Sequence, residues 1–407
     1  MAHRVSRRTS GRPREPLASQ ARHRALTAQL RLLEPPGPRI AAAPILTPFL
    51  KWPGGKSQEL AAISASAPEL TGRFIDPFVG GGSVLLATPA EVPAWANDAT
   101  EDLVRLYVAA ASRRSALHEA ALGLARAWDD LGGLDPLYAD LADAFLTRSH
   151  HRAQDIVDHN IRGLRAFIDT AGSGLSEQFG LRLVSDLPRK FERMRKIETA
   201  IGSQLSRVDL LENVEGAIRS ALYMSVRARY NRTRLAARWD EFRLADFFFL
   251  REFAYAAMFR FNRRGEFNVP YGGISYNRKS FADKVALLSG PEMLARLANT
   301  QWRCGDFEPF LCEAAPGSDD FVFIDPPYDS DFSDYDDVPF GPRDQQRLQQ
   351  ALDSLPARVM IVIKDTPMIR DLYRSDRWRV AEAGKTYMWT IKSRNDRAVT
   401  HLTITNY

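Results

Sequence analysis

Apolar runs alternate with helical periodicity in two separate parts of the chain. Residues 73–88 show a short apolar run, a glycine-rich turn and the start of a helix, and residues 93–112 repeat this order with an acidic turn. Residues 321–325, 343–355 and 357–365 show strand, helix and strand again. Alternation of this kind predicts βα units around a parallel sheet.

Further elements are expected at both ends of this pattern. Residues 45–68 indicate an extended piece, a glycine turn and a helix. Near the C-terminus, residues 385–391 and 399–407 have the alternation of strands and are joined by the polar turn KSRND. A closing antiparallel hairpin is a common edge of an otherwise parallel sheet.

The middle of the chain follows a different pattern. From about residue 113 to residue 225 the sequence is rich in Ala, Leu and Arg and predicts helices, including a basic amphipathic helix at 187–199. This helix fits either a solvated face or a contact with the DNA backbone. Residues 245–273 predict a strongly apolar helix that runs into a basic glycine loop.

Composition is typical of a soluble globular protein, and the cysteine content indicates the cytoplasm. Of its 407 residues, 45% are hydrophobic and 26% charged, and no apolar run approaches the length of a membrane helix. The basic N-terminus has no apolar stretch behind it, so we expect no signal peptide. Two cysteines, Cys304 and Cys312, argue against a disulfide framework and indicate a reducing compartment.

Positive charge is concentrated in two segments. Residues 1–40 contain nine Arg and two acidic residues, or +7, whereas the whole chain carries +5. This segment is either an unfolded leader or an arm that contacts nucleic acid. Residues 219–284 contain fourteen Lys and Arg against six Asp and Glu, or +8, interleaved with aromatic residues, which indicates a basic surface for a polyanion.

The glycine-rich turn predicts a ligand site. Residues 76–83, DPFVGGGS, follow a predicted strand and open a helix, where glycines allow a ligand to approach the backbone. Asp98 ends the next predicted strand, at the spacing of a carboxylate that hydrogen-bonds ribose hydroxyls. A nucleoside-bearing cofactor is therefore favoured. ATP hydrolysis is a weaker alternative, because Gly54-Gly55-Lys56-Ser57 lacks the first glycine of a phosphate-binding loop.

The sequence FVFIDPPY at 321–328 suits the methylation of an amino group. An aromatic amine is a poor nucleophile until its nitrogen becomes tetrahedral, and acceptors for its two hydrogens favour that geometry. The carboxylate of Asp325 and the carbonyl of Pro326 can act as these acceptors. Tyr328 offers a face on which a flipped base can stack, worth about 1–3 kcal/mol.

Four stretches together resemble the Dam-type, or D12-class, DNA adenine methyltransferases. They are FLKWPGGK at 49–56, FVGGG at 78–82, RFNRRGEFNVPYGG at 260–273 and DPPY at 325–328. The resemblance implies S-adenosylmethionine as cofactor, double-stranded DNA as substrate and no metal. The implied cofactor-binding residues are Trp52, Lys56, Asp76, Phe78, Gly80, Gly82, Asp98 and Asp325. The implied catalytic residues are Asp325, Pro326 and Tyr328, and the implied DNA-binding residues are Arg260, Asn262, Arg264, Asn268 and Tyr271.

The expected fold class is α/β, a Rossmann-like S-adenosylmethionine-dependent methyltransferase fold with an inserted helical target-recognition domain. We divide the chain into a disordered Arg- and Pro-rich arm (1–44), a first methyltransferase part (45–112), a helical target-recognition domain (113–285) and a second methyltransferase part (286–407). The helical extension at 113–225 fits either an enlarged recognition domain or an insertion for a partner, such as a cognate restriction or defence protein.

The resemblance has one departure and leaves two rival functions open. Tyr255-Ala256-Ala257 stands where the family commonly has Tyr-Asn-Gly, so the recognised DNA sequence is not implied. The first rival is an amino-methyltransferase acting on RNA or on a protein glutamine, which would not be expected to carry RGEFNVPYG. The second is an inactive DNA-binding relative, against which the intact Asp325, Tyr328, Gly80 and Gly82 argue.

Overall fold

A computed structural model describes residues 37–41, 45–113, 115–172, 174–327, 340–386 and 398–407. Arg39–Tyr407 form one compact unit, to which the elements below belong. The predicted N-terminal arm, residues 1–44, lies almost wholly outside the described residues. None of the helices in these ranges combines the length and the apolar character needed to cross a membrane.

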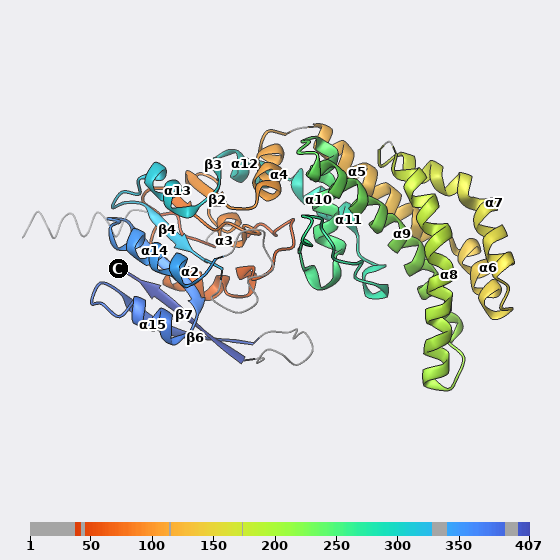
Figure 1. The fold of residues 1–407 in the computed structure, drawn as a ribbon. Helices are drawn as coiled ribbons and strands as arrows, with labels where there is room; N and C mark the ends of the chain where they lie inside the picture. The colour runs from red at the N-terminus through yellow and green to blue at the C-terminus, as the bar shows by residue number, and fades with distance from the viewer. Residues whose placement is uncertain (1–36, 42–44, 114, 173, 328–339, 387–397) are drawn as a thin grey trace, which may run out of the picture. The chain divides into compact units, whose positions relative to one another are not determined.

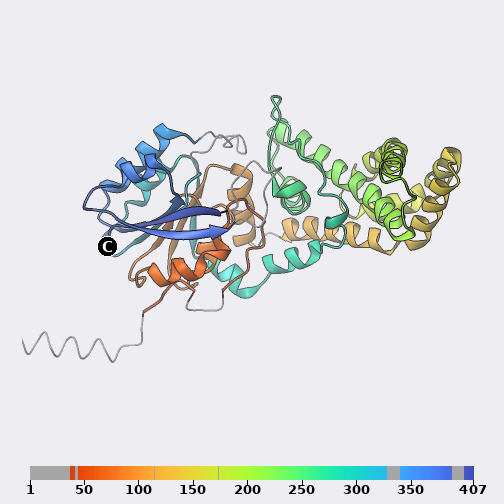
Figure 2. The ribbon, with the colours of Figure 1, turned by 90° about the horizontal axis from the view of Figure 1, so that it is seen from below.

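The described residues contain a seven-stranded sheet with the strand order β3-β2-β1-β4-β5-β7-β6 (Figure 1). Its strands are β1 (Phe74–Asp76), β2 (Ala94–Asp98), β3 (Thr300–Cys304), β4 (Phe321–Ile324), β5 (Arg358–Lys364), β6 (Arg379–Thr386) and β7 (Ala398–Thr405). The first five strands pair in parallel, whereas β7 is antiparallel to both β5 and β6 (Figure 2). The predicted parallel sheet with a closing antiparallel pair is therefore confirmed.

Both faces of the sheet are apolar, because its central strands are hydrophobic at consecutive positions. In β4, Phe321 and Phe323 belong to one buried cluster and Val322 and Ile324 to another. Helices α13 (Phe307–Ala314), α14 (Pro342–Asp353) and α15 (Pro367–Leu372) supply residues to the second cluster. Helices α2 (Leu60–Ser66), α3 (Ser83–Leu86), α4 (Glu101–Ala111) and α12 (Pro291–Ala298) supply residues to the first. This layering is typical of a parallel sheet covered on both faces.

The middle of the chain is helical, as its composition predicts. It contains α5 (Ser115–Asp130), α6 (Asp135–Leu146), α7 (His150–Asp169), α8 (Leu175–Ile201), α9 (Arg207–Leu235) and α10 (Glu241–Phe253), followed by α11 (Phe281–Leu288). Short 3-10 turns occur at Lys56–Gln58, Leu131–Gly133, Tyr255–Ala257 and Ile274–Tyr276. The core cluster that covers one face of the sheet continues through these helices.

Side-chain caps and glycines explain where the longest helices begin and end. The hydroxyl of Ser206 accepts a hydrogen bond from the N–H of Asp209 at the start of α9, and Asp240 accepts one from Arg243 at the start of α10. Helix α8 ends at Ile201 and is followed by Gly202, whose φ of 70° is in the left-handed region. These are the ordinary start and stop signals of helices.

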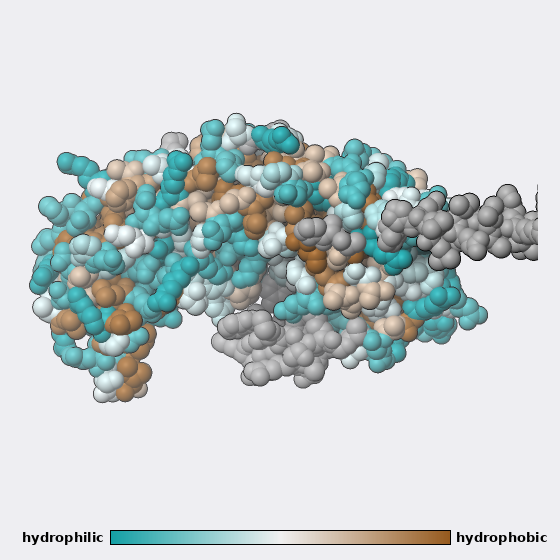
Figure 3. Space-filling view, turned by 180° about the vertical axis from the view of Figure 1, so that it is seen from behind, coloured by the Kyte–Doolittle hydropathy of each residue, from teal (hydrophilic) through white to brown (hydrophobic). Residues whose placement is uncertain are grey.

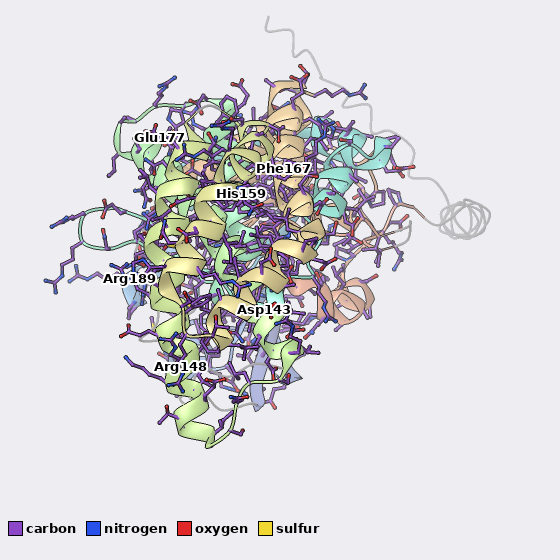
Figure 4. All side chains as sticks on the ribbon, turned by 90° about the vertical axis from the view of Figure 1, so that its right-hand side faces the viewer. Asp143, Arg148, His159, Phe167, Glu177 and Arg189 are labelled. Atoms are coloured by element: carbon purple, nitrogen blue, oxygen red, sulfur yellow. The ribbon has the colours of Figure 1, made fainter. Side chains whose placement is uncertain are left out.

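The surface of α6, α7 and α8 carries charges of both signs. Figure 4 looks onto these helices, and His159, Glu177 and Arg189 are exposed there. The predicted basic helix at 187–199 lies within α8, and its Arg189 side chain is 79% exposed. Apolar side chains gather in Figure 3 at the tip where α8 passes to α9, and Ile201 and Val208 are exposed on either side of that turn.

A buried ion pair joins the helical region to the α/β part. Asp102, in the first turn of α4, accepts hydrogen bonds from Arg243 of α10 at 2.9 and 3.2 Å. The hydroxyl of Tyr230 on α9 donates to the same carboxylate at 2.6 Å. Because all three side chains are buried, these bonds fix the register between α4, α9 and α10.

Two strands differ from the prediction. Strand β3 was not anticipated, because an edge strand of sequence TQWRC with only one fully buried residue has no apolar run. The strand expected at 385–391 begins earlier than expected, because β6 covers Arg379–Thr386. Residues 387–391 of this prediction lie outside the described ranges. Its register is set by pairing with β7, where Arg379 lies opposite Thr405.

Candidate active site

Three carboxylates come together at the carboxyl end of the central strands. Asp76 is the last residue of β1, Asp98 is the last residue of β2, and Asp325 directly follows β4. Strand β1 lies between β2 and β4 and is parallel to both. The strand order reverses between β1 and β4, which is where open α/β sheets bind their ligands.

Asp76 is the most deeply buried of the three. Its side chain accepts a hydrogen bond from the N–H of Phe78 at 3.1 Å. Burial raises the pKa of Asp76 well above its usual range, the Phe78 bond opposes this, and the charges of Asp325 and Asp98 add to it. The site therefore disfavours three simultaneous negative charges unless a cation accompanies them.

Lys56 provides such a cation. The residue is 3% exposed, and its ammonium group forms an ion pair with the carboxylate of Asp325. It also donates to the carbonyl oxygen of Gly54 at 3.1 Å. This arrangement holds Asp325 as a positioned hydrogen-bond acceptor.

The glycine-rich turn needs glycine for conformation and for space. Gly80 has a φ of 48° and Gly82 a φ of 72°, both in the left-handed region. A Cβ added at Gly80 would lie 2.8 Å from Cδ1 of Trp52, and one at Gly82 would lie 2.9 Å from the hydroxyl of Tyr107. The glycines therefore allow the side chains of Trp52 and Tyr107 to pack closely against the turn.

Asp98 fixes the same turn from the neighbouring strand. It accepts the N–H of Gly80 at 3.0 Å on one oxygen and the N–H of Thr100 at 2.9 Å on the other. Although Asp98 keeps some exposed surface, desolvation raises its pKa against these two bonds. Asp98 also accepts a hydrogen bond from the Thr100 side chain, and because a carboxylate has about four lone-pair positions, acceptor capacity remains for a ligand.

A buried glutamine donates a hydrogen bond to the backbone that follows Asp325. Pro326 is buried and Pro327 is exposed. Nε2 of Gln345, on α14, donates to the carbonyl oxygen of Pro327 at 3.0 Å. Tyr328, the third predicted catalytic residue, lies outside the described residues.

The two predicted aromatic contacts of the cofactor lie at opposite sides of the turn. Trp52 packs against the turn itself. The Phe78 ring is partly exposed and packs 5.5 Å from the ring of Phe307 and 5.6 Å from that of Phe340. The structure therefore brings together all the predicted cofactor-binding residues around the ends of β1, β2 and β4.

The predicted DNA-binding residues divide into an exposed group and an internal group. Arg260 and Arg264 are exposed, and Arg260 donates to Oδ1 of Asn268 at 3.3 Å. Asn262 Oδ1 accepts from the N–H of Arg264 at 2.9 Å and from that of Glu266 at 3.0 Å, so this side chain shapes the loop.

Tyr271 belongs to the internal group. It is 8% exposed and its hydroxyl donates to Oδ1 of Asn277 at 2.9 Å. Its ring lies 5.8 Å from that of Trp128. Tyr271 therefore packs beneath the loop, whereas Arg260 and Arg264 are exposed groups of the loop.

Sequence reasoning missed several residues that build the site. Tyr107 donates to the carbonyl oxygen of Gly80 at 3.0 Å and stacks on Trp302 at 4.6 Å. Arg251 contacts the segment that carries Trp52. The signal for Arg251 was an Arg-Glu pair inside the apolar run FFFLREFA, because charges in such a run need buried partners; Tyr107 and Gln345 gave no comparable signal.

The residues at this edge fit a nucleoside cofactor. Asp98 retains acceptor capacity and some exposure, and the left-handed glycines place the turn beside it. Among the described residues, no group of three or more His, Cys, Asp or Glu could hold a metal ion. The sheet order, the glycine turn after β1 and the carboxylate after β4 define a protein of the Rossmann-like methyltransferase class.

Comparisons with known proteins narrow this class. Residues 52–158 and 186–387 match the family model of the D12 class N6 adenine-specific DNA methyltransferases, and the chain belongs to this family. It is thus an adenine-specific DNA methyltransferase. Residues 159–185, which lie between the two matched segments, cover the second half of α7 and the start of α8.

Several known proteins are similar to this chain over most or part of its length. It is 26% identical over 370 residues to the type II methyltransferase M1.LlaDCHI of Lactococcus lactis subsp. cremoris, covering 89% of this chain and 96% of the relative. It is 26% identical over 331 residues to M.MjaIII of Methanocaldococcus jannaschii, covering 77% and 83%. The retron Ec67 DNA adenine methylase of Escherichia coli is 28% identical over 197 residues, covering 47% and 65%.

Proposed function

We propose that the site at the ends of β1, β2 and β4 binds S-adenosylmethionine and an adenine extruded from double-stranded DNA, and that the enzyme methylates the exocyclic amino group of that adenine. The convergence of Asp325, Asp98 and the Gly80–Gly82 turn at one edge of the sheet carries this proposal. S-adenosylmethionine supplies an electrophilic methyl group when bound.

Asp98 is suited to the ribose hydroxyls. Its carboxylate is fixed by the N–H groups of Gly80 and Thr100, so its free lone pairs have a defined direction. Trp52 offers an aromatic face beside the turn. Lys56, although buried, is held at the border between the cofactor residues and Asp325.

Asp325 and the Pro326 carbonyl would receive the two hydrogens of the adenine amino group. Acceptance of these hydrogen bonds favours the tetrahedral nitrogen that attacks, and it directs the nitrogen lone pair away from the ring. The ion pair with Lys56 holds the Asp325 carboxylate in place. The carboxylate acts here as a positioned acceptor in a largely water-free site.

The loop after α10 would contact the DNA. Arg260, Arg263 and Arg264 are exposed on it, and Asn262 holds its turn. Arginines on a protruding loop can reach phosphates and guanine edges. We assign residues 113–285 to target recognition and the segments 45–112 and 286–407, which contribute all described strands of the sheet, to methyl transfer.

Transfer of label tests this function directly. Purified protein, labelled S-adenosylmethionine and unmethylated duplex DNA should give labelled N6-methyladenine, and expression in methylation-free cells followed by genome-wide mapping should reveal the recognised sequence. Labelled RNA or protein without labelled DNA would support the amino-methyltransferase rival. Binding of the cofactor without any transfer would support the inactive DNA-binding rival.

A further inference from the structure

Arg251 is a buried cation of the helical region that contacts residues 51–56, the segment that carries Trp52 and Lys56. We call residues 51–56 the cofactor segment. It belongs to α10 and is 1% exposed. Its Nε and Nη2 atoms donate to the carbonyl oxygen of Lys51 at 3.1 and 2.9 Å. Two bonds from one guanidinium to one carbonyl fix the backbone immediately before Trp52.

The same guanidinium contacts two aromatic rings from different parts of the chain. Its central carbon lies 4.3 Å from the centroid of the Trp52 ring and 4.8 Å from that of the Phe259 ring. Trp52 precedes the first strand of the sheet, whereas Phe259 lies in the loop after α10 that carries Arg260, which we call the recognition loop. Arg251 therefore contacts both the cofactor segment and the recognition loop.

Trp52 extends this contact to the glycine turn. A Cβ at Gly80 would lie 2.8 Å from the Trp52 ring, and a Cβ at Gly81 would lie 2.9 Å from Cβ of Trp52. Movement of Trp52 would therefore change the space beside Gly80. Arg251 also places positive charge near Asp98, where it favours the carboxylate.

We propose that Arg251 is a positioning residue that holds Trp52 and the Lys51 backbone against the glycine turn, and that it links the recognition loop to cofactor binding through Phe259. This inference rests on the cofactor site proposed above. A planar guanidinium can donate in its plane while its face lies against a ring, which an ammonium group cannot do.

The test compares Arg251→Lys and Arg251→Gln with a matched control, Arg296→Lys. Arg296 is also fully buried, and its Nη1 and Nη2 atoms donate to the carbonyl oxygens of Pro89 and Asn299 at 2.6 and 2.8 Å. It lies on α12, and these hydrogen bonds join it to residues outside the candidate site. The control therefore makes the same exchange in a similar setting without touching Trp52.

Cofactor affinity is measured by calorimetry with S-adenosylmethionine, and stability by urea unfolding. We expect both Arg251 variants to weaken cofactor binding by about tenfold or more, with duplex affinity in the absence of cofactor changed by less than about twofold. In steady state, KM for the cofactor should rise more than kcat falls. Arg296→Lys should lower stability while leaving the cofactor Kd within about twofold.

A pH profile gives a second readout that a purely structural role would not move. Because the charge of Arg251 favours the Asp98 carboxylate, its removal in Arg251→Gln should shift the acid limb of cofactor binding to higher pH. Unchanged cofactor affinity and an unchanged profile in folded Arg251 variants would overturn the positioning role.

Phe259→Leu tests the link to the recognition loop, and it preserves the test if the Arg251 variants do not fold. It keeps apolar volume and leaves the bonds from Arg251 to Lys51 in place. Without DNA, the cofactor Kd of this variant should be nearly that of the wild type. The factor by which duplex DNA lowers the cofactor Kd should be smaller than in the wild type by about threefold or more. The proposed link through Phe259 would be overturned if duplex DNA lowered the cofactor Kd of this variant as much as that of the wild type. It would also be overturned if duplex DNA did not lower the cofactor Kd of the wild type.

Failure of this inference differs from failure of the proposed function. If the wild-type enzyme does not bind S-adenosylmethionine, or if Asp98→Ala binds it as tightly as the wild type does, the cofactor site is misplaced. If the wild type binds and Asp98→Ala does not, while Arg251→Lys binds normally, only the positioning role of Arg251 is wrong.

Discussion

Exchanging Asp325 for alanine should reduce both stability and turnover, for separable reasons. The exchange removes the carboxylate that pairs with the Lys56 ammonium group, in a residue that is 3% exposed and also donates to the Gly54 carbonyl oxygen. Breaking a fully buried ion pair costs about 3–5 kcal/mol, and because the Asp325 side chain is 21% exposed we expect a loss of about 2–3 kcal/mol. Turnover should fall at least about tenfold, since a hydrogen bond to a charged acceptor is worth at least about 1.4 kcal/mol.

A second exchange separates these two effects. Lys56→Met combined with Asp325→Ala removes both charges and should recover most of the lost free energy of unfolding, because an apolar pair of similar volume is often neutral in place of a buried ion pair. Turnover should stay low. Urea unfolding and methylation of a duplex with labelled cofactor measure the two quantities, with Lys56→Met alone as the control. The reasoning is refuted if Asp325→Ala keeps more than about a tenth of wild-type turnover, or if the double variant is as unstable as Asp325→Ala.

Three further exchanges address the cofactor, the recognised sequence and the pH dependence of stability. Asp98→Ala should weaken S-adenosylmethionine binding far more than DNA binding, and an unchanged cofactor Kd would contradict the ribose role. Arg260→Ala should relax the methylated motif at one position, worth about 1–3 kcal/mol of discrimination; an unchanged motif with lower yield in methylome sequencing would make Arg260 a backbone contact. Because burial raises the pKa of Asp76 above its unfolded value, its contribution to stability is full below about pH 3.9 and is lost as pH rises. Asp76→Asn should therefore stabilise the apo-protein by an amount that grows as pH rises above about 3.9, and a difference that stays constant with pH would show that the pKa of Asp76 is not raised in the folded protein.

Local patterns were sufficient to place the three carboxylates. Asp76, Asp98 and Asp325 each end an apolar run, and the carboxyl ends of parallel strands share one edge of a sheet. Their convergence could thus be predicted once the runs were interpreted as parallel strands. The strand order could not, because it depends on which strand edges meet over long sequence separations.

Contacts between distant segments account for what the sequence did not reveal. Strand β3 lies at the edge of the sheet and has one buried residue in five, so burial leaves no apolar pattern. Strand β6 begins at Arg379, and its register is set by pairing with β7. Arg251 and Lys51 are 200 positions apart, and only the packing of α10 against the cofactor segment reveals their contact.

The two alanines after α10 show how a departure in sequence becomes a physical cost. Ala256 and Ala257 have φ values of 52° and 56°, in the left-handed region that disfavours a Cβ by about 1–2 kcal/mol per residue. Glycine at position 256 would remove that cost but lose about 0.5–1 kcal/mol of unfolded-chain entropy, which leaves a net stabilisation of roughly 0.5–1 kcal/mol. Because Ala256 is exposed, the exchange removes little packing. Ala166→Gly, at an exposed position in α7, should instead destabilise by about 1 kcal/mol. Urea unfolding of both variants should give shifts of opposite sign, and destabilisation by Ala256→Gly would show that this backbone is not strained.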